Sequence, residues 1–264
     1  MSDEQNLALF CDFENVALGV RDAKLDKFDI GLVLERLLLK GMIVTKKAYC
    51  DWDRYKSFKA GMHEAAFELI EIPNVKMSGK NSADIRMVVD ALDLCYTKEH
   101  IDTFVVISGD SDFSPLVSKL RENAKTVIGV GVRNSTSDLL VTNCDEFIFY
   151  DDLAQSIKPR KSTGKKRSKK AKKKTAQPVD KAQEAIDLVV ATTEALYAER
   201  GDKAKLWGSM IKQTLKRRKP GFNESAFGFA SFSDLLEEAA NRGAIELEQD
   251  ERSGGYIIKG LASG

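Results

Sequence analysis

Acidic side chains in three short motifs are the residues of this sequence best suited to catalysis. Asp12 lies in CDFEN, Asp84 follows SGKNSA, and Asp110 and Asp112 lie in SGDSDF. Hard divalent cations prefer carboxylate and carbonyl oxygens, and carboxylates that share a cleft repel one another unless a cation lies between them. Such ions activate water and stabilise the leaving oxygen of a phosphodiester. The motifs therefore predict a Mg²⁺ or Mn²⁺ site made by these four aspartates.

Each acid also has a structural interpretation when it is taken alone. Asp12 and Asp112 could cap the helices that follow them, and Asp84 could be a helix-end charge favoured by the helix dipole. Asp90 lies six residues after Asp84, about 120° further around a helix, so it is a candidate for a supporting role only. The presence of all the acids in one segment favours a shared site.

Two patterns alternate along the first 150 residues, and together they predict the elements that position the acids. Short apolar runs rich in β-branched residues predict strands, which cover residues 7–13, 42–50, 67–72, 103–109, 125–132 and 146–150. Segments with helical spacing predict helices over 28–40, 82–96 and 114–123. Apolar strands that alternate with helices indicate an α/β fold, in which a mainly parallel sheet is covered on both faces.

The strand predictions place the acids at one edge of the sheet. CDFEN follows the first predicted strand and SGDSDF follows the fourth. Ligands of parallel α/β sheets gather at the carboxyl ends of the strands. For the helix over 82–96, the spacing of Ile85, Val88, Val89 and Leu92 predicts a buried apolar stripe.

Charge is distributed very unevenly along the chain. Residues 1–157 hold 18 Lys and Arg against 26 Asp and Glu, whereas residues 158–174 hold 11 basic residues and no acidic one. This pattern suggests a polyanionic partner held by the basic run. Residues 158–180 are low in complexity and lack a core, so they predict a disordered linker between a domain at 1–157 and a domain at 181–264.

The last segment has the pattern of a winged helix. Helices are predicted over 180–201, 206–218 and 231–243, with Ser231 as an N-cap and Gly243 as a stop. The runs AIELEQD and GGYIIKG predict a closing hairpin. Three helices and a hairpin indicate a small winged-helix domain.

Several other classes of protein are disfavoured. The four cysteines form no CxxC pair, so free thiols are expected rather than a zinc site or a disulfide framework. The sequence contains no GxxxxGK[ST] motif, so an NTP-driven motor is not indicated. The start MSDEQNLALF lacks the features of a signal peptide, and no apolar run reaches the roughly 20 residues of a membrane span. We therefore expect a cytoplasmic protein without a membrane partner.

The order DFEN, GKNSADI and SGDSDFSPLV, within residues 5–152, resembles the NYN domain of the PIN-like nuclease superfamily, in its bacterial type. The resemblance implies a PIN-like parallel sheet sandwiched by helices, and RNA cleavage that depends on Mg²⁺ or Mn²⁺. It implies a catalytic set made of Asp12, Asn15, Asp84, Asp110 and Asp112. Lys80 and Asn81, which precede Asp84, are then expected to contact RNA phosphates, although Lys80 could equally be an ordinary loop lysine.

The segment from 181 to about 260 resembles the OST-HTH, or LOTUS, domain through RRKPGFNE and AFGFASFSDLLE. This resemblance implies RNA binding, including structured or G-rich RNA, while some members of that family bind proteins instead. The expected contact is a basic ridge, defined here as Lys212, Lys216, Arg217, Arg218 and Lys219. The alternative interpretation of this ridge is a solvated helix end without a role in binding. A nearby group of phenylalanines is expected mainly in the core, with stacking on RNA bases as the alternative.

These features together predict a metal-dependent ribonuclease, most simply an endoribonuclease, whose attached RNA-binding module selects the substrate. Two alternatives stay open from the sequence. The acidic edge could bind RNA through metal ions without turnover, or the C-terminal module could recruit a protein, which would make the chain a regulatory adaptor.

Overall fold

The computed structural model describes residues 5–72, 82–156, 181–201, 204–219, 222–250 and 253–261. The chain divides into two compact units, Met1–Lys161 and Ser162–Gly264. The predicted linker, residues 158–180, lies outside the described residues. Within the part that is described, no helix is both long and apolar enough to cross a membrane.

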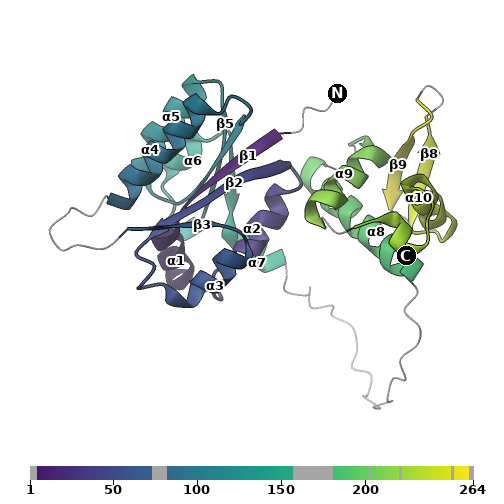
Figure 1. The fold of residues 1–264 in the computed structure, drawn as a ribbon, viewed down its shortest axis with the longest axis horizontal. Helices are drawn as coiled ribbons and strands as arrows, with labels where there is room; N and C mark the ends of the chain where they lie inside the picture. Colours follow the sequence, from purple (N-terminus) through teal and green to yellow (C-terminus); the bar gives the residue numbers. More distant parts are fainter. Residues whose placement is uncertain are drawn as a thin grey trace, which may run out of the picture. The chain divides into compact units, whose positions relative to one another are not determined.

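The first unit is built on a six-stranded sheet in which every strand pairing is parallel (Figure 1). The strands are β1 (Gln5–Asp12), β2 (Gly41–Cys50), β3 (Glu68–Glu71), β4 (Thr103–Ile107), β5 (Thr126–Gly131) and β6 (Glu146–Phe149). Their order across the sheet is β3-β2-β1-β4-β5-β6. The predicted α/β fold is therefore confirmed, and the strand ends differ from the prediction by at most two residues.

Helices cover both faces of this sheet, as Figure 1 shows. One face carries α1 (Phe13–Asp22), α2 (Ile30–Leu37), α3 (Lys56–Glu64) and α7 (Tyr150–Ser156), whose apolar residues pack with Leu7, Leu9 and Cys11 of β1. The other face carries α4 (Ser82–Thr97), α5 (Ser114–Glu122) and α6 (Asp138–Asn143), which pack with Ala8 and Phe10. Because β1 is buried on both faces, its sequence is a continuous apolar run rather than an alternating one.

The stripe predicted to be buried on α4 is wrong at two positions. Ile85 is 63% exposed and Val89 is 56% exposed. The residues that α4 buries are Met87, Ala91 and Cys95. Both sets satisfy helical spacing, so the choice between them depends on the rotation of α4 against the sheet.

The second unit contains three helices and a small antiparallel sheet. Its helices are α8 (Lys181–Arg200), α9 (Gly208–Arg218) and α10 (Phe232–Asn241), together with the 3-10 helix η3 (Glu224–Phe227). The sheet has the order β7-β9-β8, made by β7 (Leu206–Trp207), β9 (Tyr256–Leu261) and β8 (Ile245–Gln249). The predicted helices and hairpin are present, and the start of the second predicted helix is instead the short strand β7.

Local signals at the ends of α10 act as the sequence predicts. Ser231 is the N-cap, and its hydroxyl accepts a hydrogen bond of 3.1 Å from the backbone N–H of Asp234. Gly243 follows the helix with a φ of 68°, a left-handed conformation that favours glycine. The phenylalanine group belongs to the core of this unit: Phe222 and Phe232 are buried, and Phe227 stacks on Phe222 at 5.5 Å between ring centroids.

Candidate active site at the carboxyl ends of β1 and β4

Two neighbouring strands of the sheet send the chain to opposite faces. After β1 the chain enters α1 on one face, and after β4 it enters the 3-10 helix η1 (Ser111–Phe113) and then α5 on the other. In open α/β sheets, this switch of direction leaves a crevice outside the carboxyl ends of the strands, and ligands bind there. Asp12 and Asp110 lie at these strand ends, and Asp84, at the start of α4, is close enough for its charge to act on Asp12.

Asp12 is the last residue of β1 and lies almost fully inside the protein. Asp12 is 8% exposed. Its carboxylate accepts hydrogen bonds from the backbone N–H of Asn15, at 3.3 Å, and from Ser108 Oγ, at 3.0 Å. The bond from Asn15 makes Asp12 the N-cap of α1. Asp12 is therefore both a helix cap, as its structural interpretation predicted, and a residue of the candidate site.

Ser108 connects the two strand ends. While its hydroxyl donates to Asp12, the same oxygen accepts the backbone N–H of Asp110 at 3.2 Å. The side chain of Asn15 adds a second connection, because its Oδ1 accepts the backbone N–H of Gly109 at 2.9 Å. Sequence reasoning missed Ser108, although its position directly before Gly109 and Asp110 in SGDSDF was a usable signal.

Gly109 is required by the close approach of a neighbouring loop. A Cβ added at this position would lie 2.4 Å from the backbone oxygen of Ser135. The backbone oxygen of Gly109 in turn accepts the N–H of Ser137 at 2.9 Å. The loop at 135–137 therefore holds the turn that carries Asp110.

Asp110 caps the η1 turn, whereas Asp112 does not cap α5. Asp110 Oδ1 accepts the backbone N–H of Asp112 at 3.0 Å, and the N-cap position of α5 is Phe113 without a side-chain hydrogen bond. Asp112 is exposed. Its carboxylate is therefore not used for the cap that the alternative interpretation assigned to it.

The carboxylates act on one another electrostatically. The pKa of Asp12 is raised to about 7, first by burial and then by the charges of Asp84 and Asp110, while the hydrogen bonds from Asn15 and Ser108 oppose this rise. Burial also raises the pKa of Asp84, at the start of α4, with added contributions from Asp110 and Asp112. These couplings bring the acids of all three motifs into one electrostatic cluster.

Glu14 is a further acid of this cluster that sequence reasoning did not select. Its charge contributes to the raised pKa of Asp84, and its Oε1 forms an ion pair of 2.9 Å with Arg54 Nη1. The signal for Glu14 was its place in the DFEN motif. This ion pair brings the cation of Arg54 to the edge of the cluster. Nothing in the sequence around Arg54 predicted that it would lie there.

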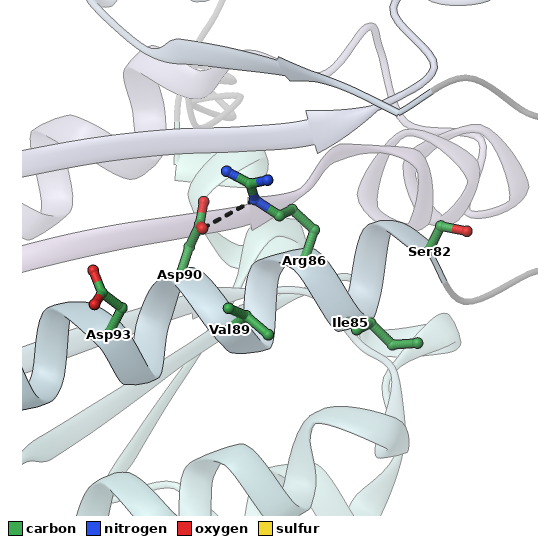
Figure 2. A pocket seen from close by; sticks show the side chains of 6 residues that line it. All are labelled: Ser82, Ile85, Arg86, Val89, Asp90 and Asp93. Carbon is green, nitrogen blue, oxygen red and sulfur yellow. Dashed lines mark hydrogen bonds and ion pairs between the residues drawn. The ribbon is translucent and has the colours of Figure 1, made fainter.

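Asp90 belongs to a separate network on α4. It accepts hydrogen bonds from Tyr49 Oη at 2.9 Å and from Arg86 Nε at 3.0 Å, and Lys47 Nζ lies 3.4 Å away. Figure 2 shows the pair of Arg86 and Asp90 one turn apart on α4, where they line one pocket together with Ile85 and Val89. With these partners, Asp90 anchors α4 to β2, and it does not contribute to the raised pKa of Asp12 or Asp84.

The acidic cluster has the donor chemistry that Mg²⁺ and Mn²⁺ require. Its ligand atoms are carboxylate oxygens, and burial together with the neighbouring carboxylates raises the pKa of Asp12 and Asp84, so a cation would stabilise their ionised forms. Among the described residues, no three Asp, Glu, His or Cys side chains are already close enough to hold one ion. The cluster therefore fits a divalent ion by chemistry and charge, and some of its side chains would turn toward an ion on binding.

The predicted RNA contacts have different outcomes. Lys80 and Asn81 lie outside the described residues. In the second unit, Lys216, Arg217 and Arg218 form the last turn of α9, and Lys219 is its C-cap. Lys212 instead forms an ion pair of 2.7 Å with Glu224 and lies over the ring of Phe232, so part of its charge is used within the unit.

Comparison with known proteins identifies the first unit. A family model described as the NYN domain matches residues 6–152. An uncharacterized protein of Methanocaldococcus jannaschii is 30% identical over 145 residues, which are 55% of this chain and 55% of that protein. This chain thus spans about half the length of that curated relative.

One solved structure has a similar fold. It is a protein of unknown function from Vibrio parahaemolyticus, with a TM-score of 0.51 and 26% sequence identity, and the match covers 58% of this chain and 97% of that one. The NYN family has a nuclease-type fold, and PIN-like domains of this kind usually hydrolyse RNA and generally use divalent metals. Because the family model covers more than half of the sequence, the chain belongs to the NYN domain family of the PIN-like nuclease superfamily.

Proposed function

We propose that this protein is a metal-dependent ribonuclease that hydrolyses phosphodiester bonds of RNA within the strand. The observation that carries the proposal is the Ser108 bridge between Asp12 and the Asp110 turn at the carboxyl ends of β1 and β4, with Asp84 of α4 close enough that its charge raises the pKa of Asp12. A protein that needed these acids only as helix caps would have no reason to bury one of them beside two others, because that arrangement costs free energy without a cation. Membership of the NYN family supports the same reaction.

Each residue of the site has a proposed role. Asp12, Asp84, Asp110 and Asp112 would hold Mg²⁺ or Mn²⁺, which when bound would activate water and stabilise the leaving oxygen. Asn15 and Ser108 position Asp12 and the Asp110 turn through the hydrogen bonds described above. The ion pair with Arg54 holds Glu14 at the margin of the cluster.

We further propose that the second unit is a winged-helix module of the OST-HTH or LOTUS kind, and that it selects the RNA. Three helices, a small antiparallel sheet and the basic end of α9 support this assignment. Lys216 and Lys219 are exposed and therefore accessible to phosphates. The basic run at 158–174 would add affinity through phosphate contacts without reading the sequence.

The test is cleavage of labelled RNA and DNA mixtures by the purified full chain, with Mn²⁺, Mg²⁺ or EDTA, followed by mapping of the ends produced. Asp84→Asn and Asp110→Asn should each lower RNA cleavage by orders of magnitude, because asparagine keeps the shape and removes the charge that a cation needs. Asp93→Asn is the matched control, since Asp93 is an exposed acid of α4 that does not contribute to the raised pKa of Asp12 or Asp84.

Two results would contradict the ribonuclease proposal. Equal cleavage by wild type, Asp84→Asn and Asp110→Asn would mean that the acids are not catalytic. RNA binding without any metal-dependent cleavage by the wild type would favour the RNA-binding or adaptor alternative.

A further inference from the structure

A groove with apolar walls adjoins the acidic cluster. It is lined by Ile85, Val88 and Val89 of α4, by Leu139 of α6, and, in the segment after Asp110, by Ser111, Ser114, Pro115 and Ser118. Asp84 and Asp112 also line it. The groove and the proposed catalytic acids therefore share two residues.

The walls of the groove are unusually exposed for apolar side chains. Ile85 is 63%, Val89 56% and Leu139 56% exposed. Figure 2 shows Ile85 and Val89 on successive turns of α4, on the same side of the helix. Single exposed apolar residues need no explanation, but a group of them around one groove marks a binding surface.

A buried hydroxyl without a partner lies in the same groove. Ser114 is 7% exposed, and among the described residues its Oγ finds no hydrogen-bond partner. A buried polar group that is not hydrogen-bonded costs free energy, and a bound ligand can supply the missing bond. Ser111 and Ser118 bring two further hydroxyls to the same groove.

We infer that this groove binds an unpaired nucleobase of the RNA next to the phosphate that is cut, an inference that rests on the proposed nuclease function. A base has two apolar faces and a polar edge. The faces match Ile85, Val89 and Leu139, and the edge can bond to Ser114 Oγ once this covered hydroxyl turns toward the groove. The acids of the cluster then lie beside the backbone of the same nucleotide, because Asp84 and Asp112 belong to both places.

The groove is less suited to a protein partner. An apolar helix or a second copy of the chain would bury Asp84 and Asp112 together with the apolar walls, which costs free energy for two carboxylates without counter-charges. A nucleotide keeps these acids facing its backbone, where divalent ions bind. A base held in this groove cannot also be paired, so the RNA must be single-stranded at that position.

The test scans a single-stranded RNA with one abasic nucleotide at each position and measures kcat/KM for cleavage by the full chain. One position beside the cut should lower kcat/KM of the wild type by about tenfold. In an Ile85→Ser/Val89→Ser variant, the intact RNA should be cut about tenfold more slowly, and the abasic site should then have little further effect, because the two changes remove the same contact. Tyr96→Ser is the control, since Tyr96 is exposed on the same helix and does not line the groove.

Ser114→Ala separates a ligand contact from a structural role. Removing a buried hydroxyl without a partner should leave the melting temperature unchanged or raise it, while cleavage of the intact RNA falls several-fold and cleavage of the abasic RNA does not. The inference would be overturned if Ser114→Ala lowered cleavage of intact and abasic RNA equally. It would also be overturned if Tyr96→Ser lowered cleavage of intact RNA as much as Ile85→Ser/Val89→Ser does. Rapid cleavage of a fully paired RNA duplex would overturn it as well.

A binding experiment distinguishes failure of this inference from failure of the proposed nuclease. Single-stranded RNA that contains 4-thiouridine is cross-linked to the full chain with Ca²⁺ in place of Mg²⁺ or Mn²⁺, and the cross-linked peptides are identified. Cross-links to the groove residues of α4 and α5 would support the base site even if the wild type cuts no RNA, and cross-links confined to other segments would overturn it. Loss of a dimer in the Ile85→Ser/Val89→Ser variant, measured by sedimentation, would also overturn it and identify the groove as a protein interface.

Discussion

Asp12→Asn should stabilise the metal-free protein at neutral and alkaline pH. In the folded protein the pKa of Asp12 is raised from 3.8 to about 7, and each pKa unit corresponds to about 1.4 kcal/mol. Ionised Asp12 therefore costs the metal-free fold up to roughly 4 kcal/mol. Asparagine carries no charge, and its side-chain oxygen can still accept one of the two hydrogen bonds that Asp12 accepts.

The effect has a defined dependence on pH. Because the pKa of Asp12 is raised by folding, the native protein binds more protons than the unfolded chain between the two pKa values. The contribution of Asp12 to stability is thus fully present below pH 3.8 and is lost as the pH rises to about 7. Between about pH 5 and pH 8, wild type should lose roughly 2 to 3 kcal/mol relative to Asp12→Asn.

The assay is urea unfolding of both proteins in EDTA at these two pH values. The chain has two tryptophans, one in each unit, and Trp52 is buried in the first. Its fluorescence in a Trp207→Phe background therefore reports on the unit that contains Asp12. Adding Mn²⁺ at pH 8 should stabilise wild type and not the variant, since a ligand that binds only the native state raises stability. A difference between the proteins that does not change with pH would refute the reasoning.

Three further predictions follow from other features of the chain. Gly109→Ala should lower the midpoint of thermal unfolding by several degrees and reduce cleavage, because its Cβ would lie 2.4 Å from the backbone oxygen of Ser135; an unchanged melting curve would contradict the close approach. Replacing the Lys and Arg residues of 158–174 with Ser and Gly should weaken the binding of all RNAs alike and flatten the dependence of affinity on salt concentration. An unchanged salt dependence would mean that the run is only a spacer. Replacing Lys216 and Lys219 with Ser should change the ranking of preferred RNAs in a binding competition, and an unchanged ranking would remove the second unit as the selector.

The sequence alone predicted the strands and the edge of the sheet where the acids lie. The strands follow from short β-branched runs, and the position of Asp12 and Asp110 follows from their place directly after two of those runs. The cap at Ser231 and the stop at Gly243 are similarly local, since each depends on a few adjacent residues. These features could be predicted because backbone preference and side-chain period are properties of short segments.

Tertiary structure decided which of these features meet. The sheet order sets β1 beside β4, and only this pairing brings Ser108 within 3.0 Å of Asp12, from which it is separated by 96 positions in the sequence. The rotation of α4 turned Ile85 and Val89 outward and Met87 inward, although both sets have helical spacing. The physical reason is the same in each case: a periodic segment specifies which side chains share a face, whereas packing between distant segments determines what that face contacts.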